Sequence, residues 1–336
     1  MNPELFLEDL HRKPTVLSDL ASRLRDTDPW SALHRGYEQV VLLGMGSSAY
    51  AAGVAAARLR NRGVVAVAEL ASSDLLPPWH PDTLVVAISA SGTSRETLAA
   101  VPRLGDAATV VALTNEPQSP LAERCQHTVL MDAGPETGGV ACRSYQHTLA
   151  LLLALEAHLT GSPLSAVADV VEQAAEASAH LLESAGDWLP TLTSLLAGPD
   201  GTHLVAPARR LSSAQQGALM LREGPRRFAV GCEAGDWAHV DVYLTKNTDY
   251  RLLLFAGSSW DDGISEWTLP RNTTVVSVGG EFPGAARTLR YPHDDIDDVR
   301  LLTEMLVPEL VAARLWRAAA ARGGGADQWP GPRGSG

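Results

Sequence analysis

Three serines and a glycine follow an apolar run in the segment VVAISASGTSRET, residues 85–97. The apolar run predicts a buried strand, and the residues after it predict the start of a helix. In an open parallel sheet, ligands lie beyond the carboxyl ends of the strands, where a helix N-terminus contributes free N–H groups and partial positive charge. The hydroxyls of Ser89, Ser91 and Ser94 can each donate to an anion, and Gly92 lets the backbone approach it. This spacing predicts a site for an anion such as phosphate.

A second turn of the same kind, Gly46-Ser47-Ser48, lies between the apolar run at residues 40–43 and an alanine-rich helix. It would lie on the same edge of the sheet and form the opposite side of the site. A single serine turn after a strand is more often a helix cap than a ligand site. Two such turns on one sheet edge favour an anion site. A dinucleotide fingerprint is not supported, because Ala49 stands where a third glycine would be required.

Length and composition limit the class of protein. The chain has 336 residues, which favours two domains, and its formal net charge of −12 argues against nucleic acid or an anionic membrane as partner. An acidic protein can still bind a phosphorylated substrate, because local dipoles can oppose the overall charge. The 3 cysteines are too few and too scattered for a disulfide framework or a zinc site. No signal pattern or apolar run of membrane-spanning length is seen, so we expect a soluble cytoplasmic protein without a metal.

Short apolar runs alternate with Ala/Leu-rich stretches, which indicates a parallel sheet covered by helices on both faces. After a helical stretch at residues 4–25, the strands expected in the first half are 40–43, 64–68, 84–89, 108–113 and 127–131. Long helices are expected at residues 145–159 and 164–184. A weaker copy follows, with strands expected at 203–206, 227–230, 251–256 and 274–278, and helices at 211–222, 236–243 and 297–321. Because the turn at Gly257-Ser-Ser echoes the serine turn of the first half, we interpret the two halves as an internal duplication.

Three motifs together resemble the sugar isomerase (SIS) family: GMGSSAYAAG, SASGTSRET and AGPETGGVACRSYQHTL. The resemblance covers about residues 1–320 and extends to the double-SIS isomerase module of glucosamine-6-phosphate synthase, to fructosamine-phosphate deglycases and to SIS-type glucosamine-6-phosphate deaminases. It implies an α/β fold of two SIS domains, each a parallel five-stranded sheet flanked by helices in a three-layer, flavodoxin-like αβα arrangement. The expected boundaries are an N-terminal helix with the first SIS domain at 1–160, a helical linker at 161–195, the second SIS domain at 196–321 and a Gly/Pro-rich tail at 322–336.

The resemblance also implies roles for the serines of both turns. The residues that correspond to the family's phosphate-binding positions are Ser48, Ser89, Ser91 and Ser94, with Ser47 nearby.

In the second half, SSAQQGALMLREG resembles the family's helix that ends in a catalytic glutamate, which implies this role for Glu223. The segment that begins at Gly235 places His239 in register with the family's ring-opening histidine. A carboxylate shielded from water can move a proton between C1 and C2 of a sugar phosphate, and an imidazole can pass a proton to the ring oxygen. The residues alone leave other interpretations open: Glu223 as a solvated helix-end carboxylate beside arginines, and His239 as a surface or capping histidine.

Several positions depart from the family's motifs. Ala90 replaces a glutamine, Ala141 replaces a serine that touches the sugar, and Arg143 replaces a lysine. The family's C-terminal lysine has no counterpart, because the chain reads Pro332-Arg333 near its end without a lysine after it. We therefore expect no Schiff base at that position, and the identity of the sugar stays open.

The resemblance implies an aldose–ketose isomerase, deaminase or deglycase that acts on an aminosugar or ketosamine 6-phosphate without a glutaminase domain or cofactor. The alternative is a catalytically inactive SIS protein that senses a sugar phosphate and regulates a protein partner. In relatives the site lies at a dimer interface and receives its histidine from the other subunit, so a homodimer is expected. The remaining partner is a small-molecule sugar phosphate, with no nucleic acid and no membrane.

Overall fold

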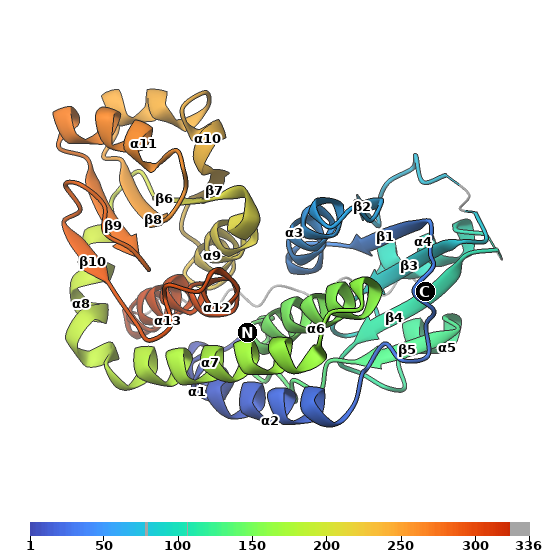
Figure 1. The fold of residues 1–336 in the computed structure, drawn as a ribbon. Helices are drawn as coiled ribbons and strands as arrows, with labels where there is room; N and C mark the ends of the chain where they lie inside the picture. The colour runs from blue at the N-terminus through green and yellow to red at the C-terminus, as the bar shows by residue number, and fades with distance from the viewer. Residues whose placement is uncertain (78–79, 106, 323–336) are drawn as a thin grey trace, which may run out of the picture.

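The apolar runs of the first half form a parallel sheet. Its strands are β1 (Gln39–Gly44), β2 (Ala66–Leu70), β3 (Thr83–Ile88), β4 (Thr109–Thr114) and β5 (His127–Leu130). They lie in the order β2-β1-β3-β4-β5 (Figure 1). The structure is a computed structural model that describes residues 1–77, 80–105 and 107–322. All five strands predicted for this half are confirmed.

Both faces of this sheet are buried, as continuous apolar strands require. Val40 and Leu42 face the larger core, whereas Val41 and Leu43 face a smaller one. The helices that complete the larger core on this side are α3 (Ser47–Asn61) and α6 (Arg143–Thr160). The smaller core is closed by α4 (Arg95–Ala100), η1 (Val101–Arg103) and α5 (Pro120–Arg124). The predicted three-layer arrangement is therefore confirmed.

The second half repeats this topology. Its strands are β6 (Thr202–Ala206), β7 (Ala229–Glu233), β8 (Arg251–Phe255), β9 (Thr274–Val278) and β10 (Arg287–Leu289). All pair in parallel, in the order β10-β9-β8-β6-β7. In each sheet the first strand in sequence lies between the second and the third, which supports the predicted duplication. Four strands were predicted here; β10 was missed because it has only three residues, of which only Leu289 is buried.

The helices of the second half differ in places from prediction. They are η2 (Ala208–Arg210), α9 (Leu211–Glu223), α10 (Ala234–Trp237), η3 (Asp241–Lys246), α11 (Asp261–Thr268), η4 (Leu269–Arg271), α12 (Asp297–Thr303) and α13 (Leu306–Ala321). A single helix at 236–243 was wrong: Asp241 turns inward and is buried while residues 238–240 are exposed, so no continuous face forms. A single helix at 297–321 was also wrong. The helix ends at Thr303 and restarts at Leu306, because Pro308 has no N–H to donate to the carbonyl of Glu304.

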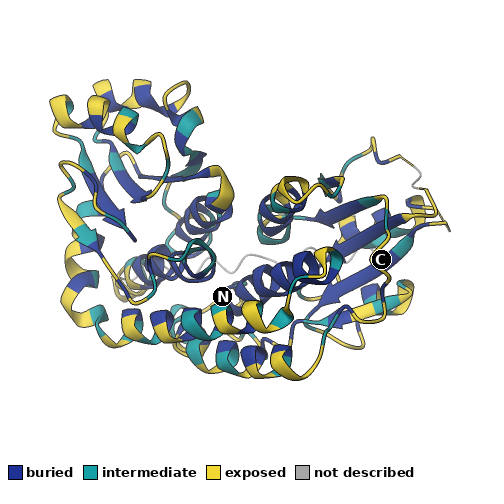
Figure 2. Ribbon diagram, viewed as in Figure 1, coloured by how far each residue is buried: buried dark blue, intermediate teal, exposed yellow. Residues whose placement is uncertain are grey.

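Four further helices join the two sheets: α1 (Pro3–His11), α2 (Lys13–Asp26), α7 (Leu164–Glu183) and α8 (Ala185–Leu196). Helix α7 runs between the two halves along the lower side of the molecule in Figure 1. One hydrophobic core contains residues of both sheets, such as Val86 and Leu253, with apolar side chains of the helices between them. Figure 2 shows α6 and α9 as largely buried helices at this junction.

Buried ion pairs tie the ends of the chain to this core. Lys13 Nζ lies 2.5 Å from a carboxylate oxygen of Glu309, and both side chains are 0% exposed. This pair connects α2 with α13.

No helix within the described ranges is long and apolar enough to cross a membrane. The predicted Gly/Pro-rich tail lies outside the described residues from position 323 onward.

Candidate functional site

A pocket of about 370 Å³ lies at the carboxyl edge of the first sheet. It is located where β1 and β3 are neighbours, the point at which strand order reverses and at which open α/β sheets bind ligands. Four of the five serines singled out in the sequence line it: Ser48, Ser89, Ser91 and Ser94. Ser47 is not among the lining residues and is partly exposed as the first residue of α3.

The turn that carries three of these serines depends on Gly92. Its φ of +62° lies in the region that favours glycine, and a Cβ there would lie 2.1 Å from the hydroxyl oxygen of Ser119. The carbonyl of Gly92 accepts a hydrogen bond of 3.1 Å from the N–H of Leu121 in α5. The turn after β3 is therefore packed tightly against α5, which fixes the direction of its hydroxyls.

The four serines differ in how their hydroxyls are engaged. Ser91 Oγ lies 2.8 Å from the hydroxyl of Thr93, and Ser94 donates a hydrogen bond of 3.1 Å to the carboxylate of Glu96. The hydroxyls of Ser48 and Ser89 make no hydrogen bond with the described residues. Two hydroxyls are thus free to bind a ligand, and two would have to exchange a partner.

The opposite wall is formed by the segment that precedes α6. One carboxylate oxygen of Glu136 accepts hydrogen bonds from the N–H groups of Cys142 (2.7 Å), Arg143 (2.6 Å) and Ser144 (3.1 Å). The other oxygen accepts one of 2.5 Å from the Ser144 hydroxyl. Glu136 therefore caps the N-terminus of α6, where a negative charge is favourable.

The three departures from the family's motifs do not all face the pocket. Ala90 and Ala141 line it. Arg143 does not, because its side chain is buried and donates to the carboxylate of Asp9 at 2.9 Å and to the carbonyl of Ala133 at 2.7 Å. Arg143 therefore fixes the pocket wall to α1 and does not belong to the pocket lining.

Helix α9 of the second half reaches this wall through Gln216. The side-chain amide of Gln216 donates a hydrogen bond of 3.1 Å to the carbonyl of Ala141, and its own oxygen is buried without a partner among the described residues. Sequence reasoning missed Gln216, although it lies within the motif that ends at Glu223. Since Glu223 follows it by two helical turns, the two residues lie about 10 Å apart along the helix axis.

Glu223 and His239 lie outside the pocket lining. Glu223 is half-buried at the end of α9, and burial raises the pKa of its carboxyl group, although Arg222 and Arg226 oppose this shift. His239 is exposed just beyond α10, and Val240 beside it is 54% exposed. Within the described residues of one chain, the structure thus brings four serines together and leaves the predicted acid–base residues apart from them.

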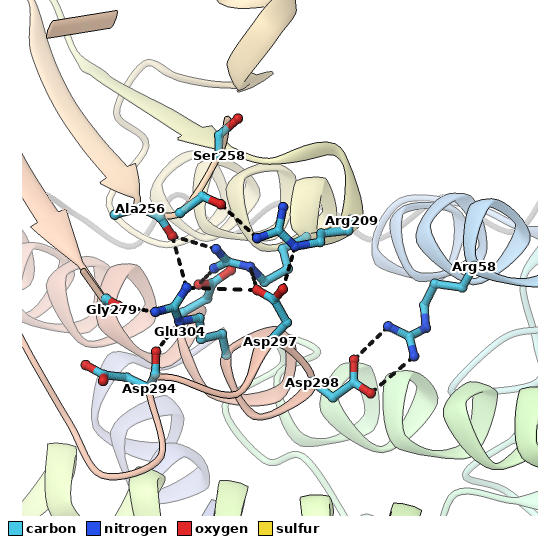
Figure 3. Close-up of polar contacts among 12 residues, drawn as sticks. Arg58, Arg209, Ala256, Ser258, Gly279, Asp294, Asp297, Asp298 and Glu304 are labelled. Carbon is cyan, nitrogen blue, oxygen red and sulfur yellow. Dashed lines mark hydrogen bonds and ion pairs between the residues drawn. The ribbon is translucent and has the colours of Figure 1, made fainter. Parts of the chain in front are cut away.

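The equivalent edge of the second sheet is occupied by charged side chains (Figure 3). The guanidinium of Arg210 is buried against the carboxylate of Glu304, and that of Arg209 donates to Asp297 at 2.6 Å. Arg300 donates to the carbonyls of Gly279 and Ala256. The positive charge at this edge is therefore matched by carboxylates of the protein itself.

The turn Gly257-Ser-Ser, which was predicted to resemble the serine turn of the first half, also has its N–H donors bound by a side chain of the same chain. A carboxylate oxygen of Asp261 accepts hydrogen bonds from the N–H groups of Gly257 (2.6 Å) and Ser258 (3.1 Å). These donors would otherwise face an anion. The duplicated turn is therefore closed by its own carboxylate, which distinguishes the second edge from the first.

One ion pair from this region joins the two halves. Arg58 of α3 donates to both carboxylate oxygens of Asp298 in α12, at 2.7 and 3.2 Å (Figure 3). It also donates to Glu156 of α6 at 2.7 Å. Helix α3 begins at the serine-lined pocket, so its far end is held against the second half.

An anion in this pocket would be held by neutral donors, because the only charged side chains among the described lining residues are the carboxylates of Glu116 and Glu136. No Lys, Arg or His lines it among the described residues. Four serine hydroxyls and the first turn of the 15-residue helix α3 are the donors that an anion would meet. The part of the chain that the structure describes contains no group of three or more His, Cys, Asp or Glu side chains that could hold a metal ion.

Comparison with known proteins gives a consistent picture. Residues 35–157 match the family model described as SIS domain. The chain is 26% identical over 259 residues to glutamine–fructose-6-phosphate aminotransferase (isomerizing) of Aeropyrum pernix, which covers 73% of this chain and 42% of that protein. The chain therefore spans about two fifths of the length of this curated relative.

Solved structures share the fold across nearly the whole chain. The C-terminal domain of glucosamine-fructose-6-phosphate aminotransferase from Francisella tularensis superposes with a TM-score of 0.78 at 16% identity, covering 93% of this chain and 96% of that one. Glucosamine-6-phosphate deaminase from Thermotoga maritima gives a TM-score of 0.71 at 16% identity, with 95% of each chain covered. At these identities the likeness shows the two-sheet fold.

Proposed function

We propose that the protein binds a sugar phosphate in the serine-lined pocket and transfers a proton between C1 and C2 of the sugar, because residues 35–157 match the family model described as SIS domain. The reaction would be an isomerisation, deamination or deglycation of an aminosugar or ketosamine 6-phosphate. The observation that carries this proposal is the convergence of Ser48, Ser89, Ser91 and Ser94 on one pocket without a cation in its lining.

Glu223 is the proposed base. Its carboxylate would take a proton from the carbon beside the carbonyl and return it to the neighbouring carbon, so that no external oxidant or reductant is needed. Its raised pKa supports this role, since a carboxyl group that titrates closer to neutral pH is a better base and acid in turn. The contact of Gln216 with Ala141 supports it as well, because α9 is thereby fixed to the pocket wall.

His239 is proposed to open the sugar ring from a second copy of the chain. Its exposure supports this arrangement, because a residue of a shared site must be accessible to the partner. Exposed apolar side chains on the same segment, Val240 at 54% and Tyr243 at 63%, support a homodimer contact here. Such a dimer would complete a site that one chain leaves without its ring-opening group.

The test is an assay of fructose 6-phosphate, glucosamine 6-phosphate and fructosamine 6-phosphates with the parent protein and with Glu223→Gln. The variant should lose about 100-fold or more in kcat, as is typical when a general base is removed. Glu266→Gln, an exposed carboxylate on α11, is the matched control and should keep parental activity. Equal turnover by the parent and Glu223→Gln would remove Glu223 from the mechanism.

A sugar-phosphate sensor is the second candidate. Ala90 and Ala141 in the pocket lining favour it, because each stands where the family's motifs have a polar side chain. It predicts that sugar phosphates raise the melting temperature without forming any product. Thermal shift combined with product analysis separates a sensor from an enzyme, since an enzyme must show both effects.

A further inference from the structure

The wall opposite the serines offers a ligand backbone groups as well as side chains. Gly139, Val140 and Ala141 line the pocket, and their N–H groups make no hydrogen bond with the described residues. A backbone N–H cannot be redirected by rotating a side chain. The direction of these donors therefore depends on whatever fixes the segment that carries them.

One buried carboxylate holds this segment at both ends. Asp9 of α1 is 1% exposed and lies outside the pocket lining. Its Oδ2 atom accepts a hydrogen bond of 2.7 Å from the N–H of Gly138, and its Oδ1 atom accepts one of 2.9 Å from the guanidinium of Arg143. Gly138 directly precedes the three lining residues, and Arg143 follows them as the first residue of α6. Asp9 thus holds the residues on both sides of the wall.

The backbone of the wall also packs directly against α1. A Cβ at Gly138 would lie 2.5 Å from the Cα atom of Phe6, so no side chain fits between them. The carbonyl of Gly138 accepts a hydrogen bond of 3.1 Å from the N–H of Asn2, the N-cap residue of α1. Both backbone polar groups of Gly138 are therefore bonded to α1 or its cap, and the wall follows the position of this helix.

We infer that Asp9 is a positioning residue, which fixes the backbone of residues 139–141 where their N–H groups can reach the sugar of a bound sugar phosphate. This inference rests on the proposed function, because it takes the serine-lined pocket as the sugar-phosphate site. The serine turns follow β1 and β3 and make no contact with Asp9, so they hold the phosphate independently of it. Loss of Asp9 should therefore weaken the contacts to the sugar and leave those to the phosphate intact.

The test compares glucose 6-phosphate with inorganic phosphate by isothermal titration in the parent and in Asp9→Asn. The new amide presents its NH2 group to one of two donors, so one of the two contacts of Asp9 is lost. The affinity for glucose 6-phosphate should fall about 5- to 10-fold, the contribution of about one hydrogen bond, whereas that for inorganic phosphate should stay within about 2-fold of the parent. The matched control is Leu253→Ala, which loses stability through a cavity in the second half and should keep both affinities.

A second variant separates the position of the wall from the charge of Asp9. Asp9→Asn leaves the buried guanidinium of Arg143 without its carboxylate, which lowers stability. Gly138→Ala changes no charge, but its Cβ would push the wall away from Phe6. It should show the same selective loss for glucose 6-phosphate, and it decides the question alone if Asp9→Asn does not fold.

The inference would be overturned if a folded variant kept the parental ratio of the two affinities or lost both affinities equally. A parent that binds both ligands equally would overturn it too, because the wall would then contribute nothing. The proposed function has a separate readout. If Ser89→Ala weakens both ligands while Asp9→Asn and Gly138→Ala keep the parental ratio, only the role of Asp9 falls. If the parent binds neither ligand, both proposals fall.

Discussion

Replacing Ser89 by alanine tests the anion site with little effect on the fold. The Ser89 side chain is only 5% exposed, yet its hydroxyl has no hydrogen-bond partner among the described residues. Removing it therefore breaks no internal bond, and we expect the free energy of unfolding to change by less than about 1 kcal/mol. A hydrogen bond to a charged group contributes about 1.5–3 kcal/mol. Loss of one such bond would weaken phosphate binding by about 10- to 150-fold.

The same reasoning ranks the other serines. Ser48→Ala should weaken binding as strongly as Ser89→Ala, because its hydroxyl is also free. Ser91→Ala and Ser94→Ala should cost less, about 2- to 10-fold, because their hydroxyls exchange a bond to Thr93 or Glu96 for one to the ligand.

Isothermal titration with glucose 6-phosphate measures these differences, and urea unfolding of each variant checks the stability. The reasoning would be refuted if Ser48→Ala and Ser89→Ala bound like the parent. It would also be refuted if Ser91→Ala and Ser94→Ala lost more affinity than the other two.

Three further predictions concern stability. Lys13→Met leaves the buried carboxylate of Glu309 without its cation, and burial already raises the pKa of Glu309 to about 7. Urea unfolding should therefore show that the free energy of unfolding falls by about 3–5 kcal/mol. The double variant Lys13→Met with Glu309→Met should recover most of this loss. Because burial raises the pKa of Glu223 in the folded chain, the parent loses stability as pH rises from the ordinary range of a glutamate carboxyl through that raised pKa, so the melting temperature of Glu223→Gln should gain on the parent over this rise in pH. A difference that stays constant with pH would contradict this. Gly92→Ala should destabilise the fold by more than about 1 kcal/mol in the same urea assay, since its φ is +62° and Ser119 fills the space beside it; parental stability would contradict the tight packing described for this turn.

The first sheet could be predicted from sequence because its strands are buried on both faces and therefore read as continuous apolar runs. The strand β10 could not, since only Leu289 of its three residues is buried. The serine turns were recognisable because strand-to-helix turns carry their chemistry locally. The break at Pro308 also had a local signal, a missing N–H within the last predicted helix, although the apolar pattern outweighed it.

Contacts between distant segments had no local signal. The Arg143 guanidinium could have faced the pocket, but it donates instead to the buried carboxylate of Asp9 and to the carbonyls of Ala133 and Pro135. The contact of Gln216 with Ala141 likewise requires α9 to pack against the wall before α6. Sequence spacing says which residues lie on an element, but it does not say which neighbour a long polar side chain will reach.

The core shared by both sheets has a consequence for how this protein loses its structure. Each half has a smaller core of its own, but Val86 and Leu253 belong to one larger apolar cluster that both halves share, and Lys13 and Glu309 connect helices from opposite ends of the chain. Heating should therefore unfold the whole chain in one cooperative transition. A fragment that contains either half alone should aggregate through the apolar surface that the other half covers in the intact chain.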